Sequence, residues 1–285
     1  MVQVLPRKPV RSEHKAGFAM ERIGLKKVKS LQFNKENFFV SQSVVNDEMR
    51  KELVSLIISI CYRYQSHASD PNICCLATKL LDLFLLNYDL LANDLVTVSF
   101  ACIVSASAHL GLPLLKTPPE QLNLLPTSCS ALEFKMLLLN IKSLTSSISL
   151  VTPMDYFLKL CSEINVPCRL ARLGMMILEG CLYSVEISVE RPSLVAAGVA
   201  GILVRIKDWN PPMTIDKFAR IAQHPFHEIF KIGVKILNYF SSFVRNYKYL
   251  DDCPLLLKYA EDCNLSVSLL TVILSANSYK PSLTN

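Results

Sequence analysis

Glycine and long apolar runs are scarce in this sequence, and each scarcity excludes a class of protein. Only 8 of the 285 residues are glycine, too few for a Gly-rich nucleotide-binding sheet or a turn-rich sandwich or barrel. The longest apolar stretches, 95–108 and 194–204, are shorter than the roughly 18–20 residues that span a membrane. The basic, polar first 29 residues contain no apolar core of a signal peptide. We therefore expect a soluble protein without a membrane partner.

What the sequence does contain is apolar side chains and an uneven distribution of charge. Hydrophobic residues make up 51% and charged residues 19%, which predicts a folded chain with one or two large domains. Residues 1–29 combine eight Lys or Arg with two Glu, and residues 30–285 are electrically balanced. Such a tail is typical of a nuclear address or a partner-binding arm, or is solvated without a specific role.

No pattern in the sequence indicates catalysis, a cofactor or a metal. The ten cysteines include no CxxC pair and several lie in apolar runs, so we expect free thiols in a reducing compartment. Gly-rich phosphate loops and the GxSxG and HExxH motifs are absent. His224 and His227 flank Pro225 and do not share a helical face suited to metal binding. The sequence therefore predicts a protein that is not an enzyme.

Hydrophobic periodicity predicts helices from residue 38 onward, in two similar halves. In the first half we expect helices starting near 49 and over 73–87, 95–110 and 130–144. In the second we expect 153–162, 167–183, 192–206, one starting at 214, and 225–246. The run Leu81–Leu85 (LDLFL) parallels Leu178–Leu182 (LEGCL), and a helix rich in small residues follows each. We therefore predict two five-helix units of about 95 residues.

Six short passages, in order along the chain, carry a resemblance to a known family. They are Phe38, Gln42 and Val45 leading into Met49-Arg50; Leu81–Leu85 in place of Leu-Asp-Arg-Phe-Leu; Ala106–Ala108 in place of Ala-Ser-Lys; Glu133; Thr152-Pro153 with Tyr156–Leu158; and Pro192-Ser193 with Ala196-Ala197. From Phe38 to about Leu270 the chain resembles a two-box cyclin, most like the mitotic A/B type. The resemblance implies an all-α fold of tandem five-helix cyclin boxes, preceded by an N-terminal helix and a flexible basic tail.

The resemblance divides the chain into four segments and implies a function. The segments are a disordered basic tail (1–37), an N-terminal box with its leading helix (38–148), a C-terminal box (149–270) and a C-terminal tail (271–285). A cyclin binds a cyclin-dependent protein kinase and holds the kinase's regulatory helix and activation loop in the active arrangement. The implied location is the nucleus, the cytoplasm or both.

The kinase-binding residues implied by the resemblance are Phe38, Gln42, Val45, Ala108, His109 and Glu133. Ala108 stands where the family has a lysine that anchors the kinase, and loss of such a contact costs on the order of 1–3 kcal/mol unless a neighbour substitutes. The adjacent His109 is the candidate substitute. The departure bears on kinase activation more than on binding.

The resemblance also assigns a structural ion pair and a substrate-docking patch. Arg50 and Asp82 are expected to form a partly buried bidentate pair that fixes helix packing. The docking patch comprises Met49, Leu53 and Leu56, with Leu56 where a tryptophan is usual. Glu52 and Ser59 depart from the family's apolar and acidic residues at this patch.

Two degradation motifs occur in the basic tail. Lys35-Glu36-Asn37 forms a KEN box, and the segment from Arg22 through Leu25 to Val28 fits RxxLxxV. Such degrons act in flexible polar segments and imply ubiquitin-ligase machinery as a partner. The KEN residues also abut the first expected helix and could simply begin it.

Two alternatives to a kinase-activating cyclin stay open. Ala108 favours a divergent cyclin that binds a kinase as a scaffold without activating it. A transcription adaptor akin to general transcription factor IIB would use the same repeat to bind protein and DNA. The balanced charge of residues 30–285 argues against nucleic acid as a partner, since DNA binding requires a basic face.

Overall fold

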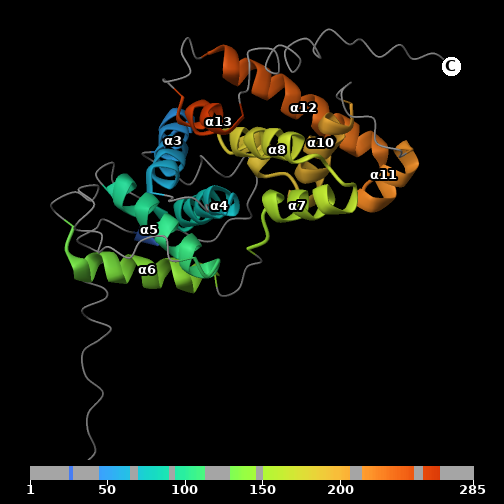
Figure 1. The fold of residues 1–285 in the computed structure, drawn as a ribbon. Helices are drawn as coiled ribbons and strands as arrows, with labels where there is room; N and C mark the ends of the chain where they lie inside the picture. The colour runs from blue at the N-terminus through green and yellow to red at the C-terminus, as the bar shows by residue number, and fades with distance from the viewer. Residues whose placement is uncertain are drawn as a thin grey trace, which may run out of the picture.

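The computed structural model describes residues 26–27, 45–64, 70–89, 94–112, 129–145, 150–205, 214–246 and 253–263. These residues are almost entirely helical, which confirms the all-α fold class. The described helices, in chain order (Figure 1), are α3 (Asp47–Tyr64), α4 (Asn72–Asn87), α5 (Leu95–His109), α6 (Ala131–Thr145), α7 (Pro153–Glu163), α8 (Cys168–Cys181), α9 (Val185–Ser188), α10 (Pro192–Val204), α11 (Ile215–Ala222), α12 (Phe226–Arg245) and α13 (Pro254–Cys263).

Helix α5 is the centre of the first group of helices. It packs against α3, α4 and α6, and its buried residues include Val98, Phe100 and Ile103 on different sides of the helix. A helix that is apolar all round is stable only when neighbours cover most of its surface. The apolar composition of α5 therefore explains why α3, α4 and α6 pack around it.

Helix α10 has the same role in the second group, where it packs against α7, α8 and α12. The contact with α12 is close because Gly198 has no side chain. A Cβ atom at this position would lie 2.7 Å from the Cγ2 atom of Ile232. The small residues predicted to bury this helix therefore also set how near α12 approaches.

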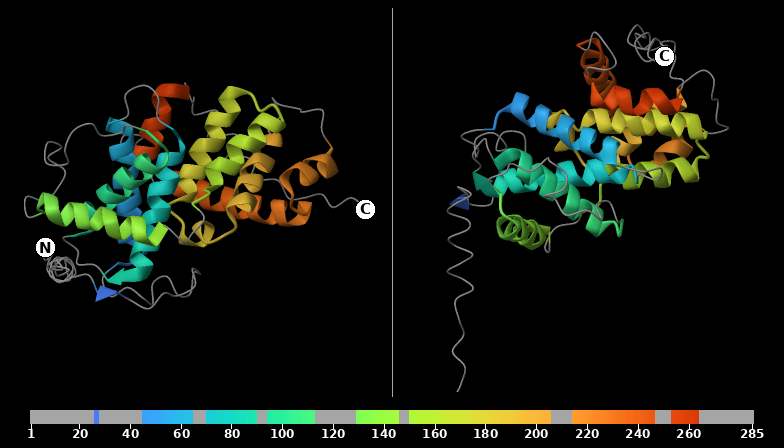
Figure 2. Two further views of the ribbon diagram at one scale, coloured as in Figure 1. Left: turned by 90° about the horizontal axis from the view of Figure 1, so that it is seen from below. Right: turned by 60° about the vertical axis from the view of Figure 1, so that its left-hand side comes forward.

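The two groups join through the first and last described helices. Helix α13 lies beside α3 and against α8, and Figure 2 shows α3 and α13 side by side in both views. A second contact links α4 to α7. Here Asn72 accepts a hydrogen bond from the Thr152 hydroxyl and donates one to Asp155.

Side-chain caps explain where several helices begin. Thr152 caps α7 in a capping box with Asp155, with Pro153 in the first helical position, as the sequence predicts. The Ser184 and Thr214 side chains cap α9 and α11, each by accepting a hydrogen bond from a backbone amide of the first turn. The Asn46 side chain accepts a hydrogen bond from the Met49 amide, at 2.9 Å. Helix α3 therefore begins at Asp47.

Three features differ from the sequence prediction. Helices α9 and α13 were not predicted, and Lys26–Lys27 form a two-residue strand, β1, antiparallel to β2 (Tyr88–Asp89). This pairing places part of the basic tail against the first group of helices, where the sequence predicted a flexible segment. Backbone pairing of two residues leaves no side-chain pattern in a sequence, which is why it was missed.

Candidate functional site

Arg50 of α3 is fully buried and lies at the centre of a polar network. Its Nε and Nη2 atoms donate to the two carboxylate oxygens of Asp82, at 2.8 and 2.7 Å. Its Nη1 atom donates to the carbonyl of Leu182 at 2.8 Å, and Nη2 also donates to the Ser188 hydroxyl at 3.3 Å. The structure thus brings together the two residues that the resemblance pairs, and joins them to the second group of helices.

The second group contains a comparable buried pair that sequence reasoning missed. The Lys258 ammonium donates to both carboxylate oxygens of Glu179, at 2.7 and 2.9 Å, and the Glu179 side chain is fully buried. Burial acts to lower the pKa of Lys258, but Cys74 and Glu179 outweigh it and raise the pKa above its ordinary value. Lys258 therefore stays charged in the protein interior.

These two pairs occupy matching places in the repeat. Asp82 is the acidic residue of the LDLFL run in α4, and Glu179 is the acidic residue of the LEGCL run in α8. Lys258 also donates to the Cys74 sulfur at 3.8 Å, so its ammonium reaches into the first group. The repeat could have indicated Glu179, but no local pattern indicates which cation pairs with it.

The predicted kinase-binding positions at the end of α5 lie on the surface. Ala108 and His109 are exposed in the last turn of that helix. The chain turns directly after them, where Gly111 adopts a φ of 69° that favours glycine. The sequence therefore presents these two residues at the point where a helix ends, and Ala108 presents a methyl group there in place of an ammonium.

Glu133 caps its own helix. Its Oε2 atom accepts hydrogen bonds from the backbone amide and the hydroxyl of Ser130, at 2.9 and 2.8 Å. The Glu133 amide in turn donates to the Ser130 hydroxyl at 3.3 Å, which completes a capping box. Ser130 and Glu133 have the required spacing, so the sequence contained this signal.

The start of α6 also lies close to other acidic and sulfur groups. Burial, and to a lesser extent the charge of Glu133, raises the pKa of Asp94. Burial raises the pKa of the Cys129 thiol, and Glu133 and Asp94 add to the effect. The carboxylates therefore make this end of the α5–α6 pair locally negative.

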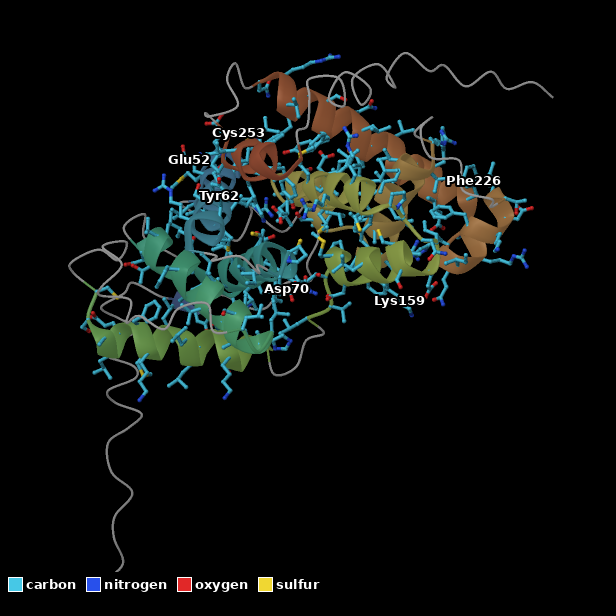
Figure 3. All side chains as sticks on the ribbon, viewed as in Figure 1. Glu52, Tyr62, Asp70, Lys159, Phe226 and Cys253 are labelled. Carbon is cyan, nitrogen blue, oxygen red and sulfur yellow. The ribbon has the colours of Figure 1, made fainter. Side chains whose placement is uncertain are left out.

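Two residues that the resemblance assigns to surfaces lie in the core instead. Val45, a predicted kinase contact, is 3% exposed, and Leu53 of the predicted docking patch is 6% exposed. Met49 and Leu56, which share a strip of α3 with Leu53, are partly buried and pack against the core. Glu52 is exposed at the outer side of α3 (Figure 3), so a charged residue now interrupts the docking patch.

The remaining predicted positions fall outside the described residues. They are Phe38, Gln42, Arg22, Leu25, Lys35, Glu36 and Asn37. Lys26 and Lys27, which lie inside the RxxLxxV segment, are described only as strand β1.

The described residues offer no group of three or more His, Cys, Asp or Glu side chains placed to hold a metal ion. His224 instead contacts the Ser193 hydroxyl, at 2.9 Å from Nε2, and burial lowers its pKa. Of the helices that the structure describes, none is long and apolar enough to cross a bilayer.

Comparison with known proteins finds similarity to cyclins in both sequence and fold. Residues 24–110, which contain α3, α4 and α5, match the family model described as "Cyclin, N-terminal domain". The X-ray structure of a viral cyclin from herpesvirus saimiri has a similar fold, with a TM-score of 0.59 and 16% sequence identity. The similarity covers 79% of this chain and 96% of the viral chain. No curated protein matches the sequence. Together these findings show a region similar to the cyclin N-terminal domain over residues 24–110 and a fold similar to that of a viral cyclin.

Proposed function

We propose that this protein is a cyclin of A/B-like type, a non-catalytic subunit that binds and positions a cyclin-dependent protein kinase and so controls the cell cycle. The observation that carries the proposal is the cyclin N-terminal domain match over α3–α5. The proposed kinase-binding residues include Ala108 and His109 at the exposed end of α5, and Glu133, which is buried at the start of α6 beside Asp94 at the start of α5. We also propose that the protein acts in the nucleus or cytoplasm, without a nucleic-acid ligand.

The geometry supports a role for Glu133 in kinase binding. The capping box holds the carboxylate in place before a partner arrives, which lowers the entropic cost of binding. Glu133 therefore begins α6 with a carboxylate that is held in place before a kinase binds.

Ala108 favours a second candidate, a cyclin that binds the kinase as a scaffold without activating it. Its methyl group cannot donate the charge-assisted hydrogen bond that the family's lysine supplies. His109 is exposed beside it and is the candidate substitute donor. If the protein is a scaffold of this kind, it binds the kinase but does not fully anchor the kinase's regulatory helix.

The test is co-purification of the full chain with a panel of cyclin-dependent kinases, followed by a histone-kinase assay on each complex. An active complex supports the activating cyclin, and a stable inactive complex supports the scaffold. Capture of no kinase overturns both. In the variant Ala108→Lys we expect the affinity for the kinase to rise by about 5- to 150-fold, which corresponds to about 1–3 kcal/mol.

Two variants separate the kinase contact of Glu133 from its capping role. Glu133→Gln keeps a capping-box residue but removes the charge, so it should weaken kinase binding while largely preserving the melting temperature. Ser130→Ala removes the cap but leaves the carboxylate, so it should lower stability by about 1 kcal/mol. Equal kinase binding by Glu133→Gln and the unaltered chain would exclude Glu133 from the contact.

We further propose that the KEN and RxxLxxV motifs of the tail recruit ubiquitin-ligase machinery. A chain in which Lys35, Glu36 and Asn37 are all replaced by Ala should then persist in synchronised cells through the period when the unaltered chain is degraded. Identical half-lives would remove the KEN box from the proposal.

A further inference from the structure

Helix α12 carries an apolar strip beside the face that it buries. The helix lies along the upper side of the second group in Figure 1 and packs against α8 and α10 through a buried face centred on Ile236. Next to this face, Phe230 is 36% exposed and Val234 is 40% exposed. Leu237 and Val244, on the same side, are partly buried. At about 100° per residue the four positions fall within about 80° of one another, and together they form the α12 strip.

A cation holds one end of the strip in place. The guanidinium carbon of Arg205, at the end of α10, lies 4.9 Å from the centroid of the Phe230 ring and 6.0 Å from that of Phe226. A cation–π contact of this kind is attractive, so the Phe230 ring is ordered at the surface although water reaches it. A segment that docks on the strip therefore meets a side chain that is already ordered, which lowers the cost of binding.

The chain continues beyond α13 with an uncharged, apolar segment. Residues 264–276 lie outside the described residues and contain no Asp, Glu, Lys or Arg. Their apolar residues are Leu265, Val267, Leu269, Leu270, Val272, Ile273, Leu274 and Ala276. Three of these form a row with the same four-and-three spacing as positions 230, 234 and 237 of the strip, namely Leu265, Leu269 and Val272. Contact between the two apolar rows removes both from water, which is favourable.

The end of α13 lies within reach of the strip. A Cβ atom on Gly180 would lie 2.6 Å from the Cε2 atom of Phe240 and 3.3 Å from the Cδ2 atom of Leu255, so α13 begins beside α12 near Phe240. Leu237 and Val244 of the strip are within about 6 Å of Phe240 along the helix. The rest of α13 adds about 12 Å, and thirteen extended residues span about 43 Å. Residues 264–276 can therefore reach the strip whichever way α13 points.

A segment of the same chain has an advantage over other occupants of the strip. Because it is tethered, it meets the strip at an effective concentration on the order of 1 mM, whereas a second copy is present only at the concentration of the protein. The segment also carries no charge that Arg205 or the exposed Lys231 would repel. Tethering and charge therefore both favour residues 264–276 as the occupant.

We propose that residues 264–276 dock on the α12 strip and cover it. The segment enters at Leu237 and Val244, beside which α13 begins, and runs toward Phe230. The docked segment completes the apolar packing of the second group of helices. The inference goes beyond the proposed function and does not depend on it, because the strip belongs to the second group and the proposed kinase-binding residues on α5 and α6 belong to the first.

The experiment uses the full chain with the photo-reactive residue p-benzoylphenylalanine in place of Phe230 or, in a second version, of Val244. After irradiation, fragment sequencing by mass spectrometry locates the residues that are joined to the probe. We expect the probe at 244 to join residues 264–269 and the probe at 230 to join residues 270–276. The same probe in place of Leu158 of α7, which is 37% exposed, should not join the segment.

A pair of charged variants tests whether the apolar row makes the contact. Leu269→Asp with Val272→Asp places two carboxylates in the contact, and burial of an unpaired charge is unfavourable. We expect the cross-link from position 230 to fall at least tenfold. The matched control, Ser266→Asp with Thr271→Asp, adds the same charge outside the row and should leave the cross-link unchanged. Thermal melts check that every variant folds.

Four results would overturn the inference. The first is the absence of a cross-link from position 230 to the segment. A cross-link between two copies would assign the strip to self-association, and one to residues 206–213 would assign it to the segment that follows α10. Equal loss in the two Asp pairs would show that the row does not make the contact. Kinase co-purification by the Leu269→Asp, Val272→Asp variant should be unchanged, which keeps a failure here distinct from a failure of the kinase proposal.

Discussion

The two halves of the protein bury one acidic residue at the same place in the repeat but neutralise it with different cations. Asp82 pairs with Arg50 from the helix that precedes it, and Glu179 pairs with Lys258 from a helix near the end of the described chain. Arg50 also donates a hydrogen bond to the Leu182 carbonyl, and Lys258 donates one to the Cys74 sulfur. Each cation therefore crosses to the other half, and the pairs fix how the halves meet.

The difference between the cations has physical consequences. The planar guanidinium of Arg50 satisfies both oxygens of Asp82 and two further acceptors, and it stays charged under all ordinary conditions. The Lys258 ammonium is a point charge on a flexible stem, and its side chain keeps 11% exposure. We therefore expect the first pair to be the less tolerant of change.

Arg50→Met is expected to have the largest effect on stability. It leaves the Asp82 carboxylate buried without a cation and removes the link to Leu182, so the free energy of unfolding should fall by about 3–5 kcal/mol. Urea denaturation measures the change. The control Lys51→Met breaks an exposed pair with Asp47 and should cost less than about 1 kcal/mol. A similarly small loss for Arg50→Met would show that the buried pair does not hold the halves together.

Lys258→Met tests the second pair and should cost about 3 kcal/mol, the lower end of the range for a broken buried pair. The double variant Glu179→Leu, Lys258→Met removes both charges, so most of the loss should be recovered. Urea denaturation of the two single variants and the double variant gives the coupling energy. If the double variant is no more stable than Lys258→Met, the cost comes from lost packing rather than from the stranded carboxylate.

Asn72→Ala breaks a further polar link between the halves, to Thr152 and Asp155. The Thr152 hydroxyl loses Asn72 as an acceptor but keeps Asp155 Oδ2, at 3.0 Å, so we expect a loss of about 0.5–1.5 kcal/mol by urea denaturation. Asn87→Ala is the matched control because Asn87 bonds only within its own helix, to the Leu83 carbonyl. Equal losses would mean that the link adds nothing to the contact between α4 and α7.

The burial of His224 predicts a small effect of pH on the free energy of unfolding. Burial lowers its pKa in the folded state, so the unfolded chain binds the proton more tightly. Its contribution is fully present above the unfolded value of about 6.5 and is lost as the pH falls below that value. His224→Gln should therefore flatten the pH dependence of stability between about pH 7 and pH 5. Parallel curves for His224→Gln and the unaltered chain would refute the assignment.

Much of the fold was predictable because helix formation is encoded locally. The apolar periodicity indicated α4, α5, α8 and α10, and the Thr152-Pro153 pair marked the start of α7. Helix α13 was missed because its apolar residues Leu255 and Leu256 are contiguous rather than periodic. The candidate site was less predictable, since Val45 and Leu53 have surface counterparts in the family but are buried here.

The sequence by itself determined the helical composition, the two-part repeat and the acidic residue at the same place in each part. It also contained the capping box of Glu133. Only the tertiary structure decided that Lys258 meets Glu179, a separation of 79 residues along the chain. It also decided that Leu132 and Leu139 of α6 face solvent. Local patterns report which side chains share a helix face. Which helix covers that face depends on packing among segments far apart in the chain.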